Sequence, residues 1–127
     1  LGVARRAFEE ILQFCRDRVQ GGKPIIEHQM IACELADMYA SIQAMRSLVW
    51  NIAWSVDNLP RDPKSVPLAM LFCTEQAFEI AHKAAEMAGG KGVMKEAPFE
   101  KILRDAFSIK HLDGGNFIKR LKITRDL

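Results

Sequence analysis

Apolar residues in the first part of the chain recur at the spacing of one helix face. Positions i, i+4, i+7, i+8, i+11 and i+15 are occupied by Ala4, Phe8, Ile11, Leu12, Cys15 and Val19. This periodicity is typical of an amphipathic helix and not of a strand. A first helix is therefore predicted to end near Val19, because Gly21, Gly22 and Pro24 follow and cannot easily continue it.

A second and longer helix is predicted from about Ile26 to Ser55, a stretch without Gly or Pro. It has roughly 30 residues and a length of about 45 Å. Its inward face is predicted, from the same period, to contain Met30, Cys33, Ala36 or Asp37, Ala40, Ala44, Leu48 and Ile52. The segment from Asn58 to Lys64 carries two prolines and predicts a turn between antiparallel neighbours.

Two further helices are indicated by their end signals. One runs from about Ser65 to Met87, with Pro67 in its first turn, where an amide donor is unpaired in any case. It ends at a glycine-rich segment that begins at Gly89. The next helix starts at Pro98 and covers about Phe99 to Ile109.

The last helix is expected to follow Asp113 and two glycines, with Asn116 as its N-cap. Its inward positions are predicted to be Phe117, Leu121 and Ile123 or Thr124. No segment alternates with period two, so no strand is expected. The predicted fold class is all-α, an antiparallel helical bundle of the four-helix up-and-down type, with three long helices closed by two shorter ones.

The composition fits one bundle domain over residues 1–127. The chain is 49% apolar, which at this length is enough for a hydrophobic core without disulfides or metal. Its 18 Lys and Arg against 16 Asp and Glu give a net charge of +2, too weak to indicate nucleic acid, and its apolar runs are too short to predict a membrane span. The chain begins at Leu1 inside a predicted helix, so we expect it to be part of a longer protein.

The cysteines indicate a reducing compartment. Cys15, Cys33 and Cys73 are odd in number, widely spaced and set in apolar-patterned segments. That arrangement is typical of buried free thiols rather than a disulfide framework or a metal site. We therefore expect a cytoplasmic location, or the mitochondrial matrix in a eukaryote.

Three sets of side chains allow both a structural and a functional interpretation. A di-metal bundle uses Glu-x-x-His on two helices, which this chain lacks, so the acidic flank around His28 and Glu34 is interpreted as solvated and no metal site is expected. Trp50 and Trp54 lie four apart and are interpreted as core or subunit interface rather than a stacking platform. A basic C-terminal set is interpreted mostly as a solvated face, with a phosphate partner left open: Lys110, Lys119, Arg120, Lys122 and Arg125.

Three loop elements contain residues that point more specifically to a bound ligand or a reaction than these three sets do. Arg18 places a permanent cation at a helix C-terminus, where it could reach an anionic ligand of a neighbouring chain. The segment from Gly89 to Gly92 offers backbone that a phosphate can approach closely. Asp113, ahead of two glycines, puts a carboxylate on a flexible elbow before a helix, either as a favourable N-terminal charge or as a base.

Taken in order, these elements resemble the C-terminal helical domain of acyl-CoA dehydrogenases over essentially the whole chain. The family pattern of Arg, two residues, Phe-Gly-x-Pro-Ile and a later Gln corresponds to Arg18, Gly21, Gly22, Pro24, Ile25 and Gln29. Further elements in family order are Leu35-Ala36-Asp37-Met38, Arg46, Glu86, Gly89-Gly90-Lys91-Gly92-Val93, Pro98, Arg104-Asp105-Ala106, Asp113-Gly114-Gly115 and Thr124-Arg125.

The resemblance implies a flavoenzyme that removes the α-proton of an acyl-CoA thioester while the β-hydrogen leaves as hydride to N5 of FAD. The family base, the Glu of Glu-Gly-Thr, corresponds to Asp113, and a desolvated carboxylate is basic enough for an acidified α-proton. The resemblance also implies an electron-transfer partner, a homotetramer and a role in fatty acid metabolism. Contacts to the flavin of a neighbouring subunit would fall on Arg18, Gln29, Glu86, Gly89 and Gly90.

Several positions depart from the family pattern. Asp113 is one methylene shorter than Glu, a displacement of roughly 1 Å that can cost on the order of 100-fold in rate. Glu86 replaces a neutral Gln near a pyrophosphate, where a carboxylate repels it. Gly21, Val93 and Gly115 replace Phe, an aromatic residue and Thr.

These departures leave alternatives open. The chain could belong to a dehydrogenase with a different acyl specificity or with its base elsewhere, to a flavin-dependent monooxygenase of the same fold, or to a non-catalytic helical association domain. We expect the 127 residues alone neither to retain FAD nor to oxidise an acyl-CoA.

Overall fold

The computed structural model describes residues 1–125 and 127. Its elements are α1 (Gly2–Asp17), β1 (Val19–Gln20), β2 (Lys23–Pro24), η1 (Ile25–Glu27), α2 (Gln29–Asn58), α3 (Ser65–Met87), η2 (Gly89–Val93), α4 (Pro98–Ile109), η3 (Leu112–Gly114) and α5 (Gly115–Arg125). The elements labelled η are short 3₁₀ turns. The all-α bundle of three long and two shorter helices is confirmed.

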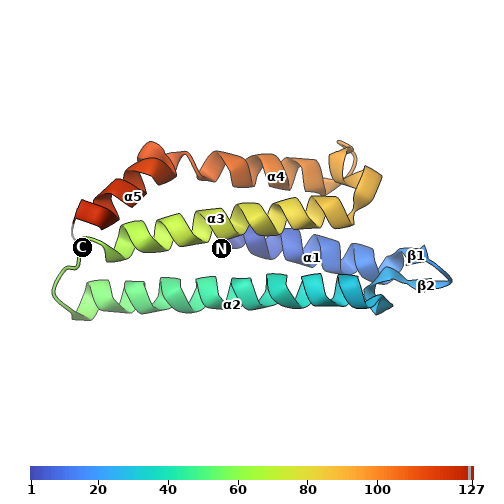
Figure 1. The fold of residues 1–127 in the computed structure, drawn as a ribbon, viewed down its shortest axis with the longest axis horizontal. Helices are drawn as coiled ribbons and strands as arrows, with labels where there is room; N and C mark the ends of the chain where they lie inside the picture. Colours follow the sequence, from blue (N-terminus) through green and yellow to red (C-terminus); the bar gives the residue numbers. More distant parts are fainter. Residues whose placement is uncertain (126) are drawn as a thin grey trace.

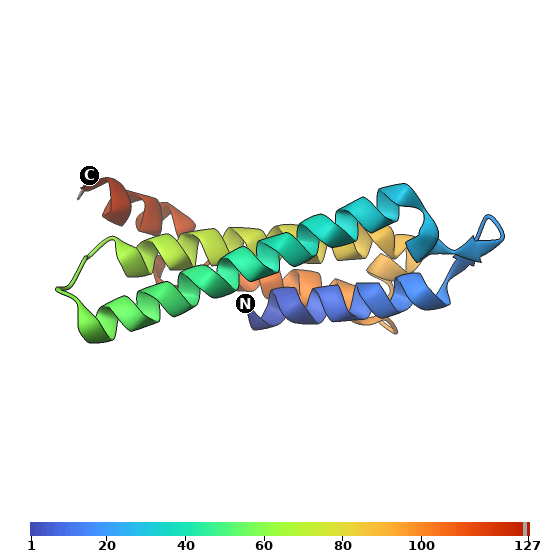
Figure 2. The same ribbon diagram turned by 90° about the horizontal axis from the view of Figure 1, so that it is seen from below.

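Helix α3 lies at the centre of the bundle and packs against all four other helices (Figure 1). Helices α4 and α5 follow one another along α3 and together take the place of a fourth long helix. Helix α1 runs along only the half of α2 that ends at the hairpin β1–β2, as Figure 2 shows from below. The two halves of the bundle therefore differ, because one half has no α1 beside it.

Small side chains allow α1 and α3 to approach closely. Ala4 and Ala7 of α1 and Ala77 and Ala81 of α3 are all buried. The largest completely buried side chains, which fill the remaining core space, are Ile11, Met38 and Met45. Close packing of this kind explains why the core consists mainly of alanine and flexible or branched aliphatic residues.

The inward face predicted for α2 is mostly wrong. The buried face consists of Leu35, Met38, Ile42, Met45 and Ile52. Of the predicted positions only Ile52 is buried and Leu48 is half-buried, while Met30, Cys33, Ala40 and Ala44 are exposed. The reason is that α2 is apolar on two faces, and periodicity alone does not show which face the other helices of the domain cover.

The orientation predicted for α5 is also wrong. Asn116 lies inside the helix, with its side chain buried rather than capping the N-terminus, and Lys119 is buried as well. Phe117 is 70% exposed, Leu121 is exposed, and only Ile123 of the predicted inward positions is partly buried. Helix α5 places a polar face on α3 because a carboxylate of α3 lies under it, as described below.

The expectation of no strand is wrong at one place, because a hairpin of two short strands replaces the end predicted for the first helix. Helix α1 ends at Asp17, and Val19 pairs with Pro24 in an antiparallel ladder. Gly21 and Gly22 have φ of 64° and 81°, the left-handed conformation that both central residues of a tight hairpin turn require. Among the helices described, none is both long and apolar enough to cross a bilayer.

Candidate functional site

Five of the six candidate residues lie at one end of the bundle. Because neighbouring helices are antiparallel, the end of α1, the start of α2 and the end of α3 meet beside the hairpin (Figure 1). These element ends carry the residues assigned to cofactor binding: Arg18, Gln29, Glu86, Gly89 and Gly90. The structure therefore brings this set together, although the residues come from distant parts of the sequence.

Arg18 has a fixed backbone and a side chain open to solvent. Its amide donates a hydrogen bond to the carbonyl oxygen of Phe14 at 2.9 Å, and its own carbonyl accepts one from the amide of Ile25 at 2.8 Å. Its guanidinium makes no hydrogen bond or ion pair within the described part of the chain. A permanent cation held at the C-terminus of α1 is thus available to an anionic ligand.

The glycines of η2 present exposed backbone. A Cβ atom added at Gly89 or Gly90 would meet no atom within 4 Å, so a ligand can approach the backbone there. Gly92 faces the opposite way and is buried against α3. Lys91 also helps to hold η2 against α1, since its Nζ lies 5.6 Å from the ring centroid of Phe14 in α1.

Glu86 and Gln29 are both exposed at this end. Glu86 Oε2 lies 3.5 Å from His82 Nδ1, one helical turn earlier in α3. The resemblance implies that this carboxylate lies near a pyrophosphate, which it would repel. With a free guanidinium and open glycine backbone beside one carboxylate, the end of the bundle fits a phosphate-bearing group such as FAD.

Asp113 lies in η3, away from the other five residues. Helix α4, with 12 residues and a length of about 18 Å, runs between the end that carries η2 and this turn. Asp113 has φ 52° and ψ 47° and is the one non-glycine residue with positive φ within residues 1–125 and 127. Its carboxylate is exposed and has no hydrogen-bond or ion-pair partner among those residues.

Asp113 also borders an open cavity of about 1250 Å³. The cavity lies in the half of the bundle that α1 does not reach, and its walls come from α2, the α2–α3 connection, α3 and α5. Leu48, Ile52, Met70 and Ile123 are among its apolar lining residues. The exposed carboxylate of Asp113 therefore stands beside a largely apolar hollow.

Glu75 of α3 is the centre of an ionic cluster beside η3. Its Oε2 lies 2.7 Å from Lys110 Nζ, and its Oε1 accepts hydrogen bonds from Asn116 Nδ2 at 2.9 Å and Arg120 Nη2 at 3.0 Å. The hydrogen bond from Lys110, with those from Asn116 and Arg120, lowers the pKa of Glu75 from 4.5 to about 2 despite partial desolvation. The carboxylate is therefore ionised at neutral pH.

Lys119 supports the same turn from α5. Its side chain is 2% exposed, and its Nζ donates hydrogen bonds to the carbonyl oxygen of Leu112 at 2.8 Å and to Asn116 Oδ1 at 3.3 Å. The solvated interpretation of the basic C-terminal set is thus wrong for Lys119, and Lys110 and Arg120 are paired with Glu75. The spacing of Asn116, Lys119 and Arg120 on one helix face is the signal that could have indicated a polar contact.

The other candidate chemistry is placed as follows. Glu79 and His82 have the Glu-x-x-His spacing once, in α3, but no group of three or more His, Cys, Asp or Glu in the described residues could hold a metal ion.

Trp50 and Trp54 are 71% and 57% exposed, so they do not belong to the core of this domain. Cys15 and Cys73 are buried free thiols as expected, but Cys33 is exposed, because it lies on the outer face of α2.

Known proteins resemble this chain over its whole length. The family described as "Acyl-CoA dehydrogenase, C-terminal domain" matches residues 1–127. The chain belongs to the acyl-CoA dehydrogenase family. It is 36% identical over 127 residues to cyclohexane-1-carbonyl-CoA dehydrogenase of Geobacter metallireducens, and 36% identical to the mitochondrial 2-methylacyl-CoA dehydrogenase of Solanum tuberosum.

The fold of this acyl-CoA dehydrogenase domain agrees with solved structures. Butyryl-CoA dehydrogenase from Megasphaera elsdenii superposes with a TM-score of 0.92 and 28% identity over 98% of the chain. In each comparison the chain covers about a third of the relative, namely 33% and 31% of the two dehydrogenases and 32% of the solved chain. The domain therefore corresponds to one part of the relatives.

Proposed function

We propose that this domain forms part of an FAD-dependent acyl-CoA dehydrogenase and supplies its catalytic base, Asp113. The observation that carries the proposal is the unpartnered Asp113 carboxylate, which stands on a turn anchored to α3, at the edge of an apolar hollow. FAD, when bound, accepts the hydride that leaves the β-carbon of the acyl-CoA. The substrate class is an acyl-CoA thioester.

Asp113 would remove the α-proton of the thioester. The thioester carbonyl acidifies this proton, so a carboxylate within hydrogen-bonding reach is a sufficient base. A carboxylate that is already neutralised by a salt bridge is a weaker base, and Asp113 has no such partner in the part of the chain that the structure describes.

The five residues at the hairpin end would serve a second cofactor, bound by a neighbouring subunit. Their separation from Asp113 by the length of α4 supports a division between two sites. Arg18 would pair with an anionic phosphate, and the exposed protein backbone at Gly89 and Gly90 would let that phosphate approach closely. Gln29 and Glu86 would line the same site.

We further propose a homotetramer that uses the outer face of α2. This face exposes Tyr39, Trp50 and Trp54, an unusual amount of large apolar surface for one helix. A Trp50→Arg variant should shift the sedimentation of the full-length protein to smaller species. An unchanged sedimentation profile would exclude Trp50 from the interface.

The enzyme would pass its electrons to an electron-transfer protein, take part in fatty acid metabolism, and work in the cytoplasm or the mitochondrial matrix. Part of a dehydrogenase cannot hold the whole cofactor site, so the isolated 127 residues should neither retain FAD nor act on an acyl-CoA. A yellow isolated domain with bound flavin would contradict this proposal.

The deciding experiment uses the full-length protein with bound FAD. Anaerobic addition of cyclohexane-1-carbonyl-CoA, a 2-methylacyl-CoA or butyryl-CoA, the types of substrate named for its relatives, should bleach the flavin absorbance. Asp113→Asn should slow bleaching by a large factor, whereas Asp57→Asn, at an exposed site on α2, should not. Bleaching that is not slowed by Asp113→Asn would place the base elsewhere.

A second candidate function is a non-catalytic association domain. It is favoured by the departures from the family pattern at Asp113, Glu86 and Gly115. In that case no acyl-CoA bleaches the flavin of the full-length protein.

The other alternative is a flavin-dependent monooxygenase of the same fold. Oxygen consumption by reduced flavin without acyl-CoA would indicate that function instead.

A further inference from the structure

We propose that Glu75 is a positioning residue that holds the turn of Asp113 in place for proton removal, an inference that rests on the proposed function. The turn is residues 111–115, which follow α4 and include the first residue of α5. Glu75 lies outside it, in the middle of α3, and its carboxylate contacts Lys110, Asn116 and Arg120 rather than Asp113. Its effect on Asp113 is transmitted through the chain on either side of the turn.

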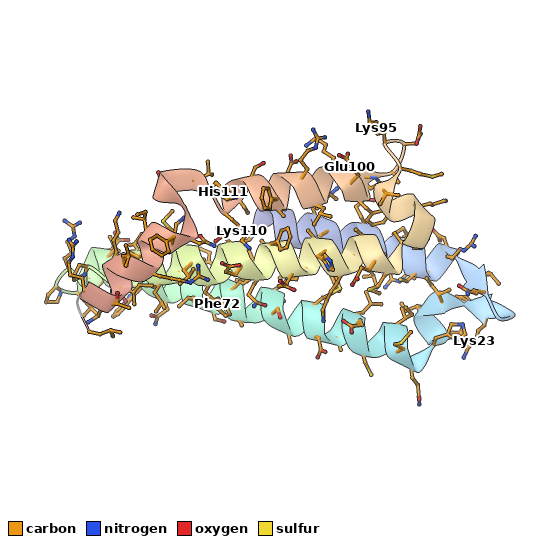
Figure 3. All side chains as sticks on the ribbon, turned by 45° about the horizontal axis from the view of Figure 1, so that its top comes forward. Lys23, Phe72, Lys95, Glu100, Lys110 and His111 are labelled. Atoms are coloured by element: carbon orange, nitrogen blue, oxygen red, sulfur yellow. The ribbon has the colours of Figure 1, made fainter. Side chains whose placement is uncertain are left out.

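Glu75 holds both sides of this turn with one carboxylate. Lys110, immediately before the turn, lies 2.7 Å from Oε2. Asn116, immediately after the turn, donates to Oε1 at 2.9 Å, and Arg120 donates to the same oxygen at 3.0 Å. Figure 3 labels Lys110 and His111 at the end of α4, next to α3. The two ends of the turn are therefore fixed to the same point of the central helix.

A second anchor acts inside the turn. Lys119 Nζ donates to the carbonyl oxygen of Leu112, the residue directly before Asp113, at 2.8 Å. Lys119 also donates to Asn116 Oδ1, so this anchor is joined to the Glu75 cluster through the Asn116 amide. The ionic cluster and the backbone of Asp113 are thus one connected network.

The turn needs external anchors because its own backbone is poorly restrained. Asp113, Gly114 and Gly115 have φ of 52°, 82° and 72°, and two of these three residues are glycines. A left-handed conformation is less favourable for a residue with a Cβ, even for Asp, which adopts it more often than most, so surrounding contacts help to hold Asp113 in it. A misplacement of about 1 Å at a reacting group can cost on the order of 100-fold in rate.

The substitution Glu75→Gln tests this role selectively. A carboxylate offers two acceptor oxygens, whereas an amide offers one acceptor and one donor of nearly the same shape. With Gln at position 75, the amide NH₂ would have to face either Lys110 or the pair Asn116 and Arg120, which are all donors. One side of the turn is then released while the side-chain volume is kept.

The experiment uses full-length protein with bound FAD and measures steady-state kinetics with the acyl-CoA that bleaches the flavin. Glu75→Gln should lower kcat roughly 10- to 100-fold with KM changed less than about threefold, because binding surfaces are retained and the base is misplaced. Hydrogen–deuterium exchange should become faster in residues 111–116. Glu34→Gln is the matched control, since it breaks the 2.6 Å ion pair between Lys83 of α3 and α2, far from the turn.

A double variant separates positioning from simple destabilisation. If Glu75 acts through Asp113, Asp113→Asn with Glu75→Gln should be no slower than Asp113→Asn alone. Multiplicative losses, or a Glu75→Gln loss no larger than that of Glu34→Gln, would overturn the positioning role. If Asp113→Asn retains full turnover, the base assignment and this inference both fail. If only Asp113→Asn is impaired, the base assignment stands and the positioning role is wrong.

Discussion

Gly92 packs directly on the backbone of Ala85: a Cβ atom at Gly92 would lie 2.0 Å from the carbonyl oxygen of Ala85. A Cβ atom does not approach a backbone oxygen that closely, so η2 would have to move away from α3 in a Gly92→Ala variant. Overpacking of this kind typically costs about 1–3 kcal/mol. We expect a thermal unfolding midpoint lower by several degrees, measured by circular dichroism.

Gly90→Ala provides the matched control for this stability measurement. Gly90 lies in the same turn, but a Cβ there would meet no atom within 4 Å, and its φ is not positive. The midpoint of Gly90→Ala should stay within about a degree of the parent. Equal losses in the two variants would show that η2 does not pack on α3 in this way.

The three cysteines should differ in reactivity in the folded isolated domain. Cys33 is exposed on α2, whereas burial raises the pKa of the Cys15 and Cys73 thiols and shields them from reagent. A disulfide reagent at neutral pH should modify one thiol rapidly and the other two only after addition of denaturant. A Cys33→Ser variant should lose the rapid phase; its persistence would contradict the exposure of Cys33.

The length and order of the helices followed from the sequence because their end signals are local. The bounds predicted for α3, Ser65 to Met87, are those observed, since proline near its start and glycine after its end mark a helix wherever it packs. The position of Arg18, Glu86 and Gly89 at the same end of the bundle was also predictable, from the family resemblance and from the antiparallel order of the helices that carry them.

The faces of the helices did not follow from the sequence. Which of two apolar stripes on α2 is buried depends on the positions of α1 and α3, and the exposed stripe at Met30 and Cys33 is as periodic as the buried one. The polar face of α5 is buried because Glu75, some 40 residues earlier, lies beneath Asn116. The spacing of Asn116, Lys119 and Arg120 indicates a polar helix face, but not the distant residue against which that face packs.

Arg18 should contribute affinity for the anionic cofactor in the full-length protein. A charge-assisted hydrogen bond is worth about 1.5–3 kcal/mol, so Arg18→Gln should weaken FAD binding roughly 10- to 100-fold and make it less sensitive to salt. Arg16→Gln, two residues earlier and also exposed at the end of α1, should have little effect. Comparable losses for both variants, measured by flavin fluorescence titration, would indicate a general charge effect rather than a contact of Arg18.

Glu75 should stabilise the domain in a pH-dependent manner. The hydrogen bond from Lys110, supported by those from Asn116 and Arg120, lowers the pKa of Glu75 from 4.5 to about 2 in the folded chain. A carboxyl group that binds its proton more weakly when folded stabilises the folded state at pH above its unfolded pKa. The stabilisation should therefore be complete above about pH 4.5 and be lost progressively as the pH falls toward 2.

The measurement compares chemical unfolding of the parent and Glu75→Gln between neutral pH and pH 2. The difference in the free energy of unfolding should be constant above about pH 4.5 and decrease as the pH falls toward 2, because protonated Glu75 then resembles the amide. Glu34→Gln serves as the control for an interhelical Lys–Glu pair outside this cluster. A difference that persists unchanged down to pH 2 would show that the stabilisation by Glu75 does not depend on its charge, and the ionic anchoring of the Asp113 turn would then be wrong.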